Sequence, residues 1–165
     1  MTIQEGQMTD SPAAVIAQAL IDKGVAYDPS GTASSWQISV DSSLDSPDDA
    51  LEVHNTDPMF QARNQITGNM EGFHAFQLTV RSVDPEKAWT MANRIARDFD
   101  LLPSQNSESI NYTNPTVVHQ DSTSSNYSIG AVTRKSGPMY VGHDMSSSRR
   151  TIYTINAIVP ILQNS

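Results

Sequence analysis

The sequence predicts an α+β fold in which two helices pack on one face of a mostly antiparallel or mixed sheet, with long polar loops between the elements. Three observations predict it. Two segments carry apolar residues at helical spacing, several short segments alternate apolar and polar residues, and polar stretches rich in serine or asparagine separate them. The chain has 165 residues, of which 38% are hydrophobic, so we expect one domain spanning residues 1–165 with a flexible N-terminus at residues 1–10.

The first helix is predicted in the segment SPAAVIAQALIDKG. Ser11 can cap its N-terminus, Pro12 suits the first helical position, and Gly24 is placed to end it. Its apolar residues lie three and four positions apart and form one stripe: Ala13, Ile16, Ala17 and Leu20, with Ile21 at the margin.

Three strands are predicted before the second helix. They are Trp36–Asp41, the segment ALEVHN, and the segment FHAFQLTVRS, in which Phe76, Leu78 and Val80 share one face. Residues Asn55–Gly72 show no sustained period, so we expect a long loop there. Loops of that length inside a compact domain are commonly functional or disordered.

The second helix is predicted from Pro85 to about Leu102, followed by Pro103. Beyond a polar loop, TVVHQ is a short predicted strand and DSTSSNYS a Ser-rich turn. The segment from Tyr127 to Arg150 reads as a strand, a Gly-Pro interruption and a second strand or hairpin. The last strand, RTIYTINAIVPIL, is expected to end near Pro160.

The charge and the residue types exclude several classes of function. With 18 acidic and 10 basic residues, the net charge of −8 disfavours a protein that reads nucleic-acid sequence, because phosphate binding relies on clustered Lys and Arg. The chain has no cysteine, which excludes disulfides and thiolate chemistry. Its start lacks the basic and apolar regions of a signal peptide, and no apolar run is long enough to span a membrane.

No catalytic or cofactor signature stands out. Asp84, at the corner between a strand and a helix, is interpreted as a helix cap. The four histidines have no paired metal-ligand spacing, and His74 is expected to be partly buried. The pair His143–Asp144 lacks a serine in a nucleophile elbow. The glycine-containing segments GNMEG and GPMYVG do not match a phosphate loop. We therefore expect no metal, no cofactor and no enzyme activity.

The candidate interface residues are Met59, Phe60, Arg63, Arg149 and Arg150. Met59 and Phe60 can anchor a partner if their loop is exposed, or fold back onto the core of their own chain. Arg149 and Arg150 form a basic pair before a strand. That pair is either a solvated turn or a contact to an acidic neighbour, and it is too small for a nucleic-acid patch.

The order of elements resembles a known family. The segments AVIAQALIDKGV, SPDDALEVHNT, FQLTVRSVDPEKAWTMANRIARDFD and RRTIYTINAIVPIL are similar to the minor capsid or tail terminator (tail completion) proteins of long-tailed bacteriophages. The resemblance spans residues 12 to 161, VRSVDPEKAW and the following helix are its most specific part, and Asn156–Ala157 supports it. Residues Pro103–Ser125 depart most from the pattern.

The resemblance implies a structural virion protein at the junction of tail and neck, assembled in the host cytoplasm. Such proteins form a homohexameric ring, cap the major tail tube protein, stop tube growth and receive a neck or head-completion protein, while DNA passes through the lumen without specific binding. Two alternatives remain open: a neck, head-completion or baseplate component, and a small hydrolase or ligand-binding module that uses His143 and Asp144.

Overall fold

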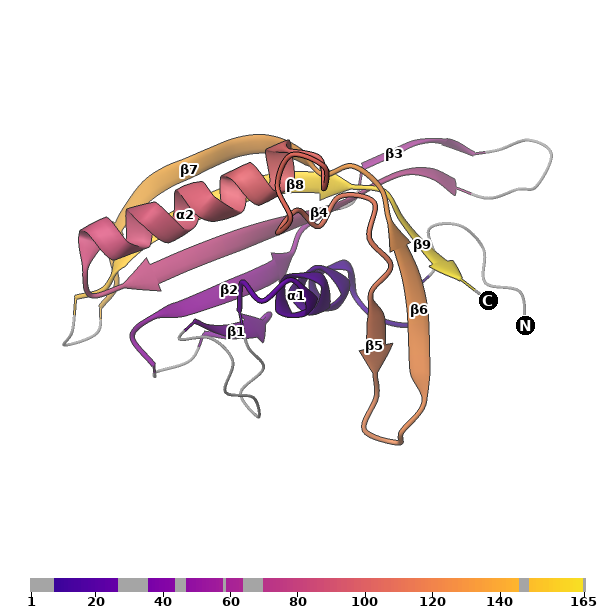
Figure 1. Ribbon diagram of the computed structural model, residues 1–165, viewed down its shortest axis with the longest axis horizontal. Helices are drawn as coiled ribbons and strands as arrows, with labels where there is room; N and C mark the ends of the chain where they lie inside the picture. Colours follow the sequence, from indigo (N-terminus) through magenta and orange to yellow (C-terminus); the bar gives the residue numbers. More distant parts are fainter. Residues whose placement is uncertain are drawn as a thin grey trace.

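The computed structural model describes residues 8–26, 36–43, 47–57, 59–63, 70–145 and 149–164, with the side chains of residues 59–63 and 70–72 outside the description. The fold is α+β, as the sequence predicts. Two helices pack on one face of a larger sheet, and a smaller sheet lies beside them (Figure 1).

The larger sheet has six strands in the order β1-β2-β4-β8-β7, with β3 paired to β4. Its strands pair antiparallel except for β1 and β2, which are parallel, so the sheet is mixed. Its bounds are β1 Gln37–Val40, β2 Ala50–Asn55, β3 Met59–Arg63, β4 Met70–Ser82, β7 Thr133–His143 and β8 Thr151–Val159.

The helices cover the apolar face of this sheet. They are α1, Pro12–Asp22, and α2, Pro85–Asp100. Alternation along β4 places Phe76, Leu78 and Val80 on the covered face, where the Phe76 ring meets Phe99 of α2 edge to face. Both helices contribute to one continuous apolar core with these side chains. The sequence predicted this packing correctly.

The smaller sheet holds β5 (Thr116–Val118), β6 (Ser124–Ile129) and β9 (Ile161–Asn164), in the order β5-β6-β9. Helix α1 contacts both β2 of the larger sheet and β5 of the smaller one. It therefore buries Val15 and Ala19 as well as its predicted stripe. The sequence predicted one apolar face for this helix because the stripe alone does not reveal that two sheets enclose it.

The expectation of a loop over Asn55–Gly72 is wrong for the described part of that segment. Strand β3 follows β2 closely, and both pair antiparallel with the long strand β4, so β3 and the start of β4 form a hairpin arm. Figure 1 shows this arm projecting beyond the body of the sheet. The segment shows no sustained alternation of apolar and polar residues, so the sequence does not indicate these strands.

Strand β7 continues through the Gly-Pro dipeptide that was read as an interruption, and β6 begins inside the Ser-rich segment read as a turn. Gly137 has a φ of 98°, and a Cβ at this position would lie 2.3 Å from the carbonyl oxygen of Thr154 on the neighbouring strand. Only glycine allows β7 to approach β8 this closely. Pro160 separates β8 from β9, as the sequence predicted for the last long strand.

Candidate assembly surface

Asp84 is the cap of α2. Its carboxylate accepts hydrogen bonds from the backbone amides of Glu86 at 3.0 Å and Lys87 at 3.4 Å, and Pro85 occupies the first helical turn. These amides have no partner inside the helix, and a negative charge is favoured at a helix N-terminus. The predicted structural role is confirmed.

The histidines lie apart and serve separate local contacts. His74 is buried on the covered face, as predicted, and burial lowers its pKa. The His54 ring lies 3.4 Å from Glu52 across two positions of β2. Among the described residues no three His, Asp or Glu side chains are grouped as metal ligands.

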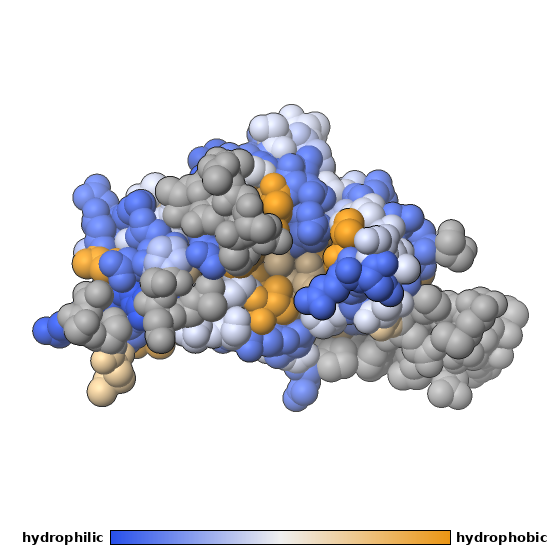
Figure 2. Space-filling view, turned by 90° about the horizontal axis from the view of Figure 1, so that it is seen from below, coloured by the Kyte–Doolittle hydropathy of each residue, from blue (hydrophilic) through white to orange (hydrophobic). Residues whose placement is uncertain are grey.

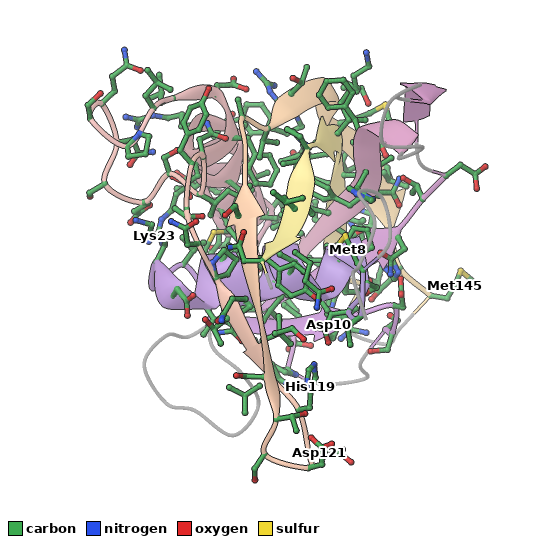
Figure 3. The ribbon with its side chains drawn as sticks, turned by 90° about the vertical axis from the view of Figure 1, so that its right-hand side faces the viewer. Met8, Asp10, Lys23, His119, Asp121 and Met145 are labelled. Carbon is green, nitrogen blue, oxygen red and sulfur yellow. The ribbon has the colours of Figure 1, made fainter. Side chains whose placement is uncertain are left out.

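His119 belongs to a hydrogen-bonded chain between the N-terminal segment and the smaller sheet. Its Nε2 lies 2.9 Å from Asp10 Oδ1, and its Nδ1 lies 3.0 Å from Thr123 Oγ1. The order Asp-His-Thr is that of a catalytic triad. However, the Thr123 hydroxyl donates its proton to Asp121 at 2.5 Å, so it is not directed at the imidazole. Figure 3 shows Asp10 and His119 together, with Asp121 at the tip of the β5–β6 hairpin.

The same chain includes Tyr127, whose side chain is fully buried. The Tyr127 hydroxyl donates to Asp10 Oδ2 at 2.6 Å and accepts from the Asp10 amide at 2.9 Å. Burial, and then the hydrogen bond to the Asp10 carboxylate, raise the pKa of Tyr127 to about 12. Thr9 and Gln163 exchange two further hydrogen bonds nearby. These contacts fasten the described N-terminal segment to β6 and β9.

The pair His143–Asp144 does not form a catalytic dyad. The Asp144 carboxylate accepts from Arg150, from Nε at 2.6 Å and from the backbone amide at 3.0 Å. The His143 ring instead meets the Tyr140 ring, with centroids 6.3 Å apart. The carboxylate thus binds Arg150, just before β8, and it does not orient the imidazole.

A second arginine, Arg81, is buried nearby on the face of the sheet opposite the helices. Its Nη1 lies 3.0 Å from Glu52 Oε1, and its Nη2 donates to the Pro47 carbonyl at 3.0 Å. Burial lowers the pKa of Arg81. The side chain of Arg150 is only 6% exposed and pairs with Asp144. Together these pairs fix the segments next to β2 and between β7 and β8 at one end of the sheet.

Helix α2 carries a buried carboxyl group at Asp98. This residue is 0% exposed, its Oδ1 accepts from Asn106 at 2.7 Å, and its Oδ2 has no partner among the described residues. Burial raises the pKa of Asp98 to about 7, and the Asn106 hydrogen bond opposes that shift. The neighbouring Glu108 is bound by Arg94 through two hydrogen bonds of 2.8 and 2.6 Å. The polar loop after α2 is held against the helix by these contacts.

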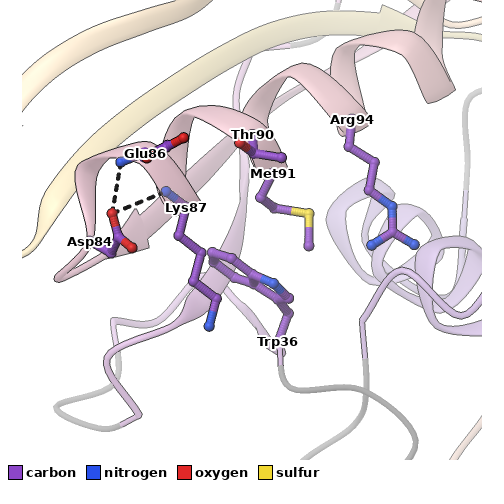
Figure 4. A pocket seen from close by; sticks show the side chains of 7 residues that line it. All are labelled: Trp36, Asp84, Glu86, Lys87, Thr90, Met91 and Arg94. Carbon is purple, nitrogen blue, oxygen red and sulfur yellow. Dashed lines mark hydrogen bonds between the residues drawn. The ribbon is translucent and has the colours of Figure 1, made fainter.

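An open hollow of about 370 Å³ lies between α2 and the start of β1. Figure 4 shows its lining, with Trp36 and Met91 at the base and charged side chains around it. Three of its four charged side chains have partners among the described residues. Asp84 caps α2, Arg94 binds Glu108, and the Lys87 ammonium pairs with Asp49 and lies 5.5 Å from the Trp36 ring centroid. These groups do not converge on a substrate position.

An exposed apolar surface runs along β7 and the adjoining side of α2, and we call it the β7 surface. It consists of Trp89, Tyr140 and Tyr153 on the helix side of the sheet, Met139 on the opposite face and Val141 next to them in β7, so it wraps around the outer edge of the sheet. Trp89 is 45% exposed, Tyr140 56% and Val141 58%. The Tyr153 ring lies between the other two aromatic rings, with centroids 5.4 Å from Trp89 and 5.7 Å from Tyr140. Aromatic side chains that are fixed in position and partly exposed are typical anchors of protein interfaces.

Strand β7 is also an outer strand of its sheet, so its backbone has one side unpaired by the described strands. A long outer strand with exposed apolar residues favours pairing with another chain. Two exposed cations lie at its ends: Lys135 on the strand and Arg149 before β8. Neither forms an ion pair with a described residue.

The predicted interface residues are spread over the molecule. Met59, Phe60 and Arg63 lie on β3 in the hairpin arm, but their side chains are outside the described residues. Arg149 is exposed. Arg150 is buried and pairs with Asp144 and Asp48, which is the contact to an acidic neighbour that the sequence left as one of two alternatives. Sequence reasoning missed the β7 surface. The available signal was Trp89, a large aromatic residue on the polar side of an amphipathic helix.

Neither described helix is long and apolar enough to cross a membrane. No protein-family model and no curated protein matches the chain. The β7 surface and the hairpin arm are the features of the described residues that point to a function.

Proposed function

We propose that the protein is a structural virion component, a tail terminator that assembles into a ring, caps the tail tube of a long-tailed bacteriophage and joins the tail to the neck. On this proposal the protein acts by binding copies of itself and other virion proteins, and it makes or breaks no covalent bond. The proposal combines the sequence resemblance over residues 12 to 161 with the β7 surface, which is the observation that carries it.

The β7 surface supports assembly because burying it in a contact between copies removes apolar area from water. Each square ångström of apolar surface contributes roughly 25 cal/mol. The Trp89 and Tyr140 rings both contact the Tyr153 ring, so little side-chain freedom is lost when they are covered. Asp84, Lys87 and Arg94 beside the hollow have partners within the chain, which favours a structural over a catalytic role.

The hairpin arm is the part we assign to the tail tube. Strand β3 pairs with β4 alone, and the arm projects from the body (Figure 1), so it can reach a neighbouring ring while the core stays unchanged. Contact of every arm with the last tube ring would block addition of the next one. The face of the ring away from the tube then receives a neck protein.

The acidic composition suits a channel for DNA. At a net charge of −8, phosphates are repelled on average, so DNA can slide without being held. Among the residues that Figure 2 colours, hydrophilic ones cover most of the visible surface and apolar ones form small areas. A ring whose lumen is lined by Lys and Arg would contradict this part of the proposal.

The decisive experiment is native mass measurement of the purified chain, with two-dimensional image averages of the protein alone and with tail tubes. We expect sixfold rings that bind at one end of each tube. A strictly monomeric protein that never joins tubes would overturn the proposal. Rings found at the neck or baseplate, away from the tube end, would favour the alternative structural role.

A matched pair of variants ties assembly to the β7 surface. Val141→Lys places a charge in the surface, whereas Val118→Lys places one on β5, where the valine is also exposed, at 70% against 58%. We expect Val141→Lys to shift the protein to monomers while its circular dichroism spectrum is unchanged, and Val118→Lys to assemble normally. Equal assembly of both variants would argue against the β7 surface.

A further inference from the structure

The two outer strands of the larger sheet run in directions that would allow them to pair between neighbouring copies. Strands β1 and β7 lie at opposite edges of the sheet (Figure 1). Strand β1 runs parallel to β2, and each later neighbour in the order β2-β4-β8-β7 reverses direction, so β7 runs opposite to β1. If copies stand side by side in one orientation, β7 of one copy therefore meets β1 of the next in antiparallel direction.

The register across the sheet shows which residues would meet. Successive pairing connects Ser39 to Glu52, Thr79, Thr154 and finally Met139. Ser39 and Met139 are thus level with each other on opposite edges and share the sheet face away from the helices. Copies placed side by side without a vertical shift bring Ser39 of one next to Met139 of another.

The lengths of the two segments also agree. Beyond Pro138, which cannot donate a backbone hydrogen bond, β7 offers a run that begins at Met139 and reaches His143. Strand β1 has 4 residues, Gln37–Val40. With Ser39 level with Met139, the exposed residues Val141, Tyr140 and Met139 lie opposite Gln37, Ile38 and Ser39, and Val40 lies opposite Pro138 at the end of the pairing.

The charges at the junction are complementary. Asp41 comes one residue after β1; its carboxylate accepts a hydrogen bond from the Asn55 backbone amide at 2.8 Å, and its side chain is still 50% exposed. Antiparallel pairing places the end of β1 beside the beginning of β7, where Lys135 is exposed and has no ion pair among the described residues. Pairing β7 with a second β7 would give Lys135 no such carboxylate from the end of β1.

We propose that β7 of each copy pairs antiparallel with β1 of the next copy, so that the larger sheet continues from subunit to subunit around the ring. This inference rests on the proposed ring and adds its contact. The contact is head-to-tail, because different edges meet, and such contacts generate closed rings when the rotation between copies closes. Backbone pairing fixes the register, while Trp89 and Tyr140 add apolar contact beside it.

Disulfide trapping tests the contact cleanly because the chain has no native cysteine. The double variant Ser39→Cys/Met139→Cys places one thiol on each edge, and disulfides require Cβ atoms about 3.5–4.5 Å apart. After mild oxidation, we expect a ladder of covalent species up to the closed ring on a denaturing, non-reducing gel. Neither single variant should form it. Ser39→Cys/Tyr140→Cys is the matched control, because these side chains lie on opposite faces of the sheet.

The outcomes separate the contact from the function. Covalent dimers from Met139→Cys alone would show β7 paired with β7 and would overturn the inference. The Gln37→Cys/Met139→Cys variant moves one thiol to the next residue of β1 on the same face. If native mass measurement shows rings but neither this variant nor Ser39→Cys/Met139→Cys forms the ladder, the inference is overturned and the proposed function stands. A monomer in every measurement would overturn both.

Discussion

At the scale of single residues, Asp98 links the stability of the fold to pH. Its pKa is raised from 3.8 to about 7, chiefly because burial disfavours the charged carboxylate. Glu108 from the following loop adds repulsion, and Arg94 and Arg97 on the same helix oppose it. The folded chain therefore holds this proton more tightly than the unfolded chain does. Its contribution to stability is complete below about pH 4 and is lost as the pH rises through about 7.

We predict that Asp98→Asn increases the free energy of unfolding at pH 8 by about 1–3 kcal/mol, because the neutral amide avoids burying a carboxylate charge whose Oδ2 has no partner among the described residues. At pH 5 the gain should be smaller, because Asp98 is then mostly protonated in the folded chain. Urea unfolding at both pH values measures this. Asp57→Asn, at an exposed position, is the control and should change little. An equal gain at both values would contradict the assignment.

Neutralising Glu52, which pairs with buried Arg81, should lower the stability of the fold, whereas neutralising Asp98 should raise it. Glu52→Gln leaves the Arg81 guanidinium buried without its carboxylate, and breaking such a pair costs roughly 3–5 kcal/mol. We expect a clear drop in the thermal midpoint. Glu86→Gln, on the exposed first turn of α2, should lower it only slightly. A similar small effect for both substitutions would mean that the pair is solvated.

At the scale of elements, the cap of α2 is the simplest contribution to test. We predict that Asp84→Ala lowers the free energy of unfolding by about 1 kcal/mol, whereas Asp84→Asn retains most of it because an asparagine oxygen can also accept from the first-turn amides. Chemical denaturation of the two variants measures the difference. Equal losses would indicate that the charge, and not the hydrogen bonds, stabilises the helix start.

The elements that the sequence predicted well are those with one buried face. Helix α2 alternates buried and exposed sides sharply, and β2 was predicted at its observed bounds. Elements in other surroundings were missed or misread. Helix α1 is enclosed on two sides, β3 pairs with β4 alone in the hairpin arm, and β7 passes through a Gly-Pro dipeptide. In each case a tertiary neighbour decides the structure, and local spacing does not record that neighbour.

The candidate surface was less predictable than the fold. Met139, Tyr140 and Val141 are apolar residues in a strand, and sequence alone cannot show that the strand lies at an edge. Arg149 and Arg150 are neighbours in sequence, yet one is exposed and the other is enclosed by Asp144 and Asp48. Exposure depends on strand order and on the course of the segments around a residue, and neither is encoded in local periodicity.

At the scale of the whole molecule, the hairpin arm and the body should be separable. We predict that replacing residues 60–72 by Asn-Gly, a pair suited to a tight hairpin turn between the partnered residues Met59 and Phe73, leaves ring assembly intact. Binding to tail tubes should be lost, because the arm is the part assigned to that contact. Native mass measurement and co-sedimentation with tubes give the two readouts. If a ring of shortened chains still binds tubes, the contact with the tube lies outside the hairpin arm.

The hydrogen bonds between Thr9 and Gln163, 154 positions apart, have a practical consequence. Because the two ends of the described chain are neighbours, a short peptide can connect them, and new ends can be opened at the exposed tip of the β5–β6 hairpin without cutting either helix. A circularly permuted chain would then carry a fluorescent label at that tip. Such a label would report the orientation of each subunit relative to the tube axis.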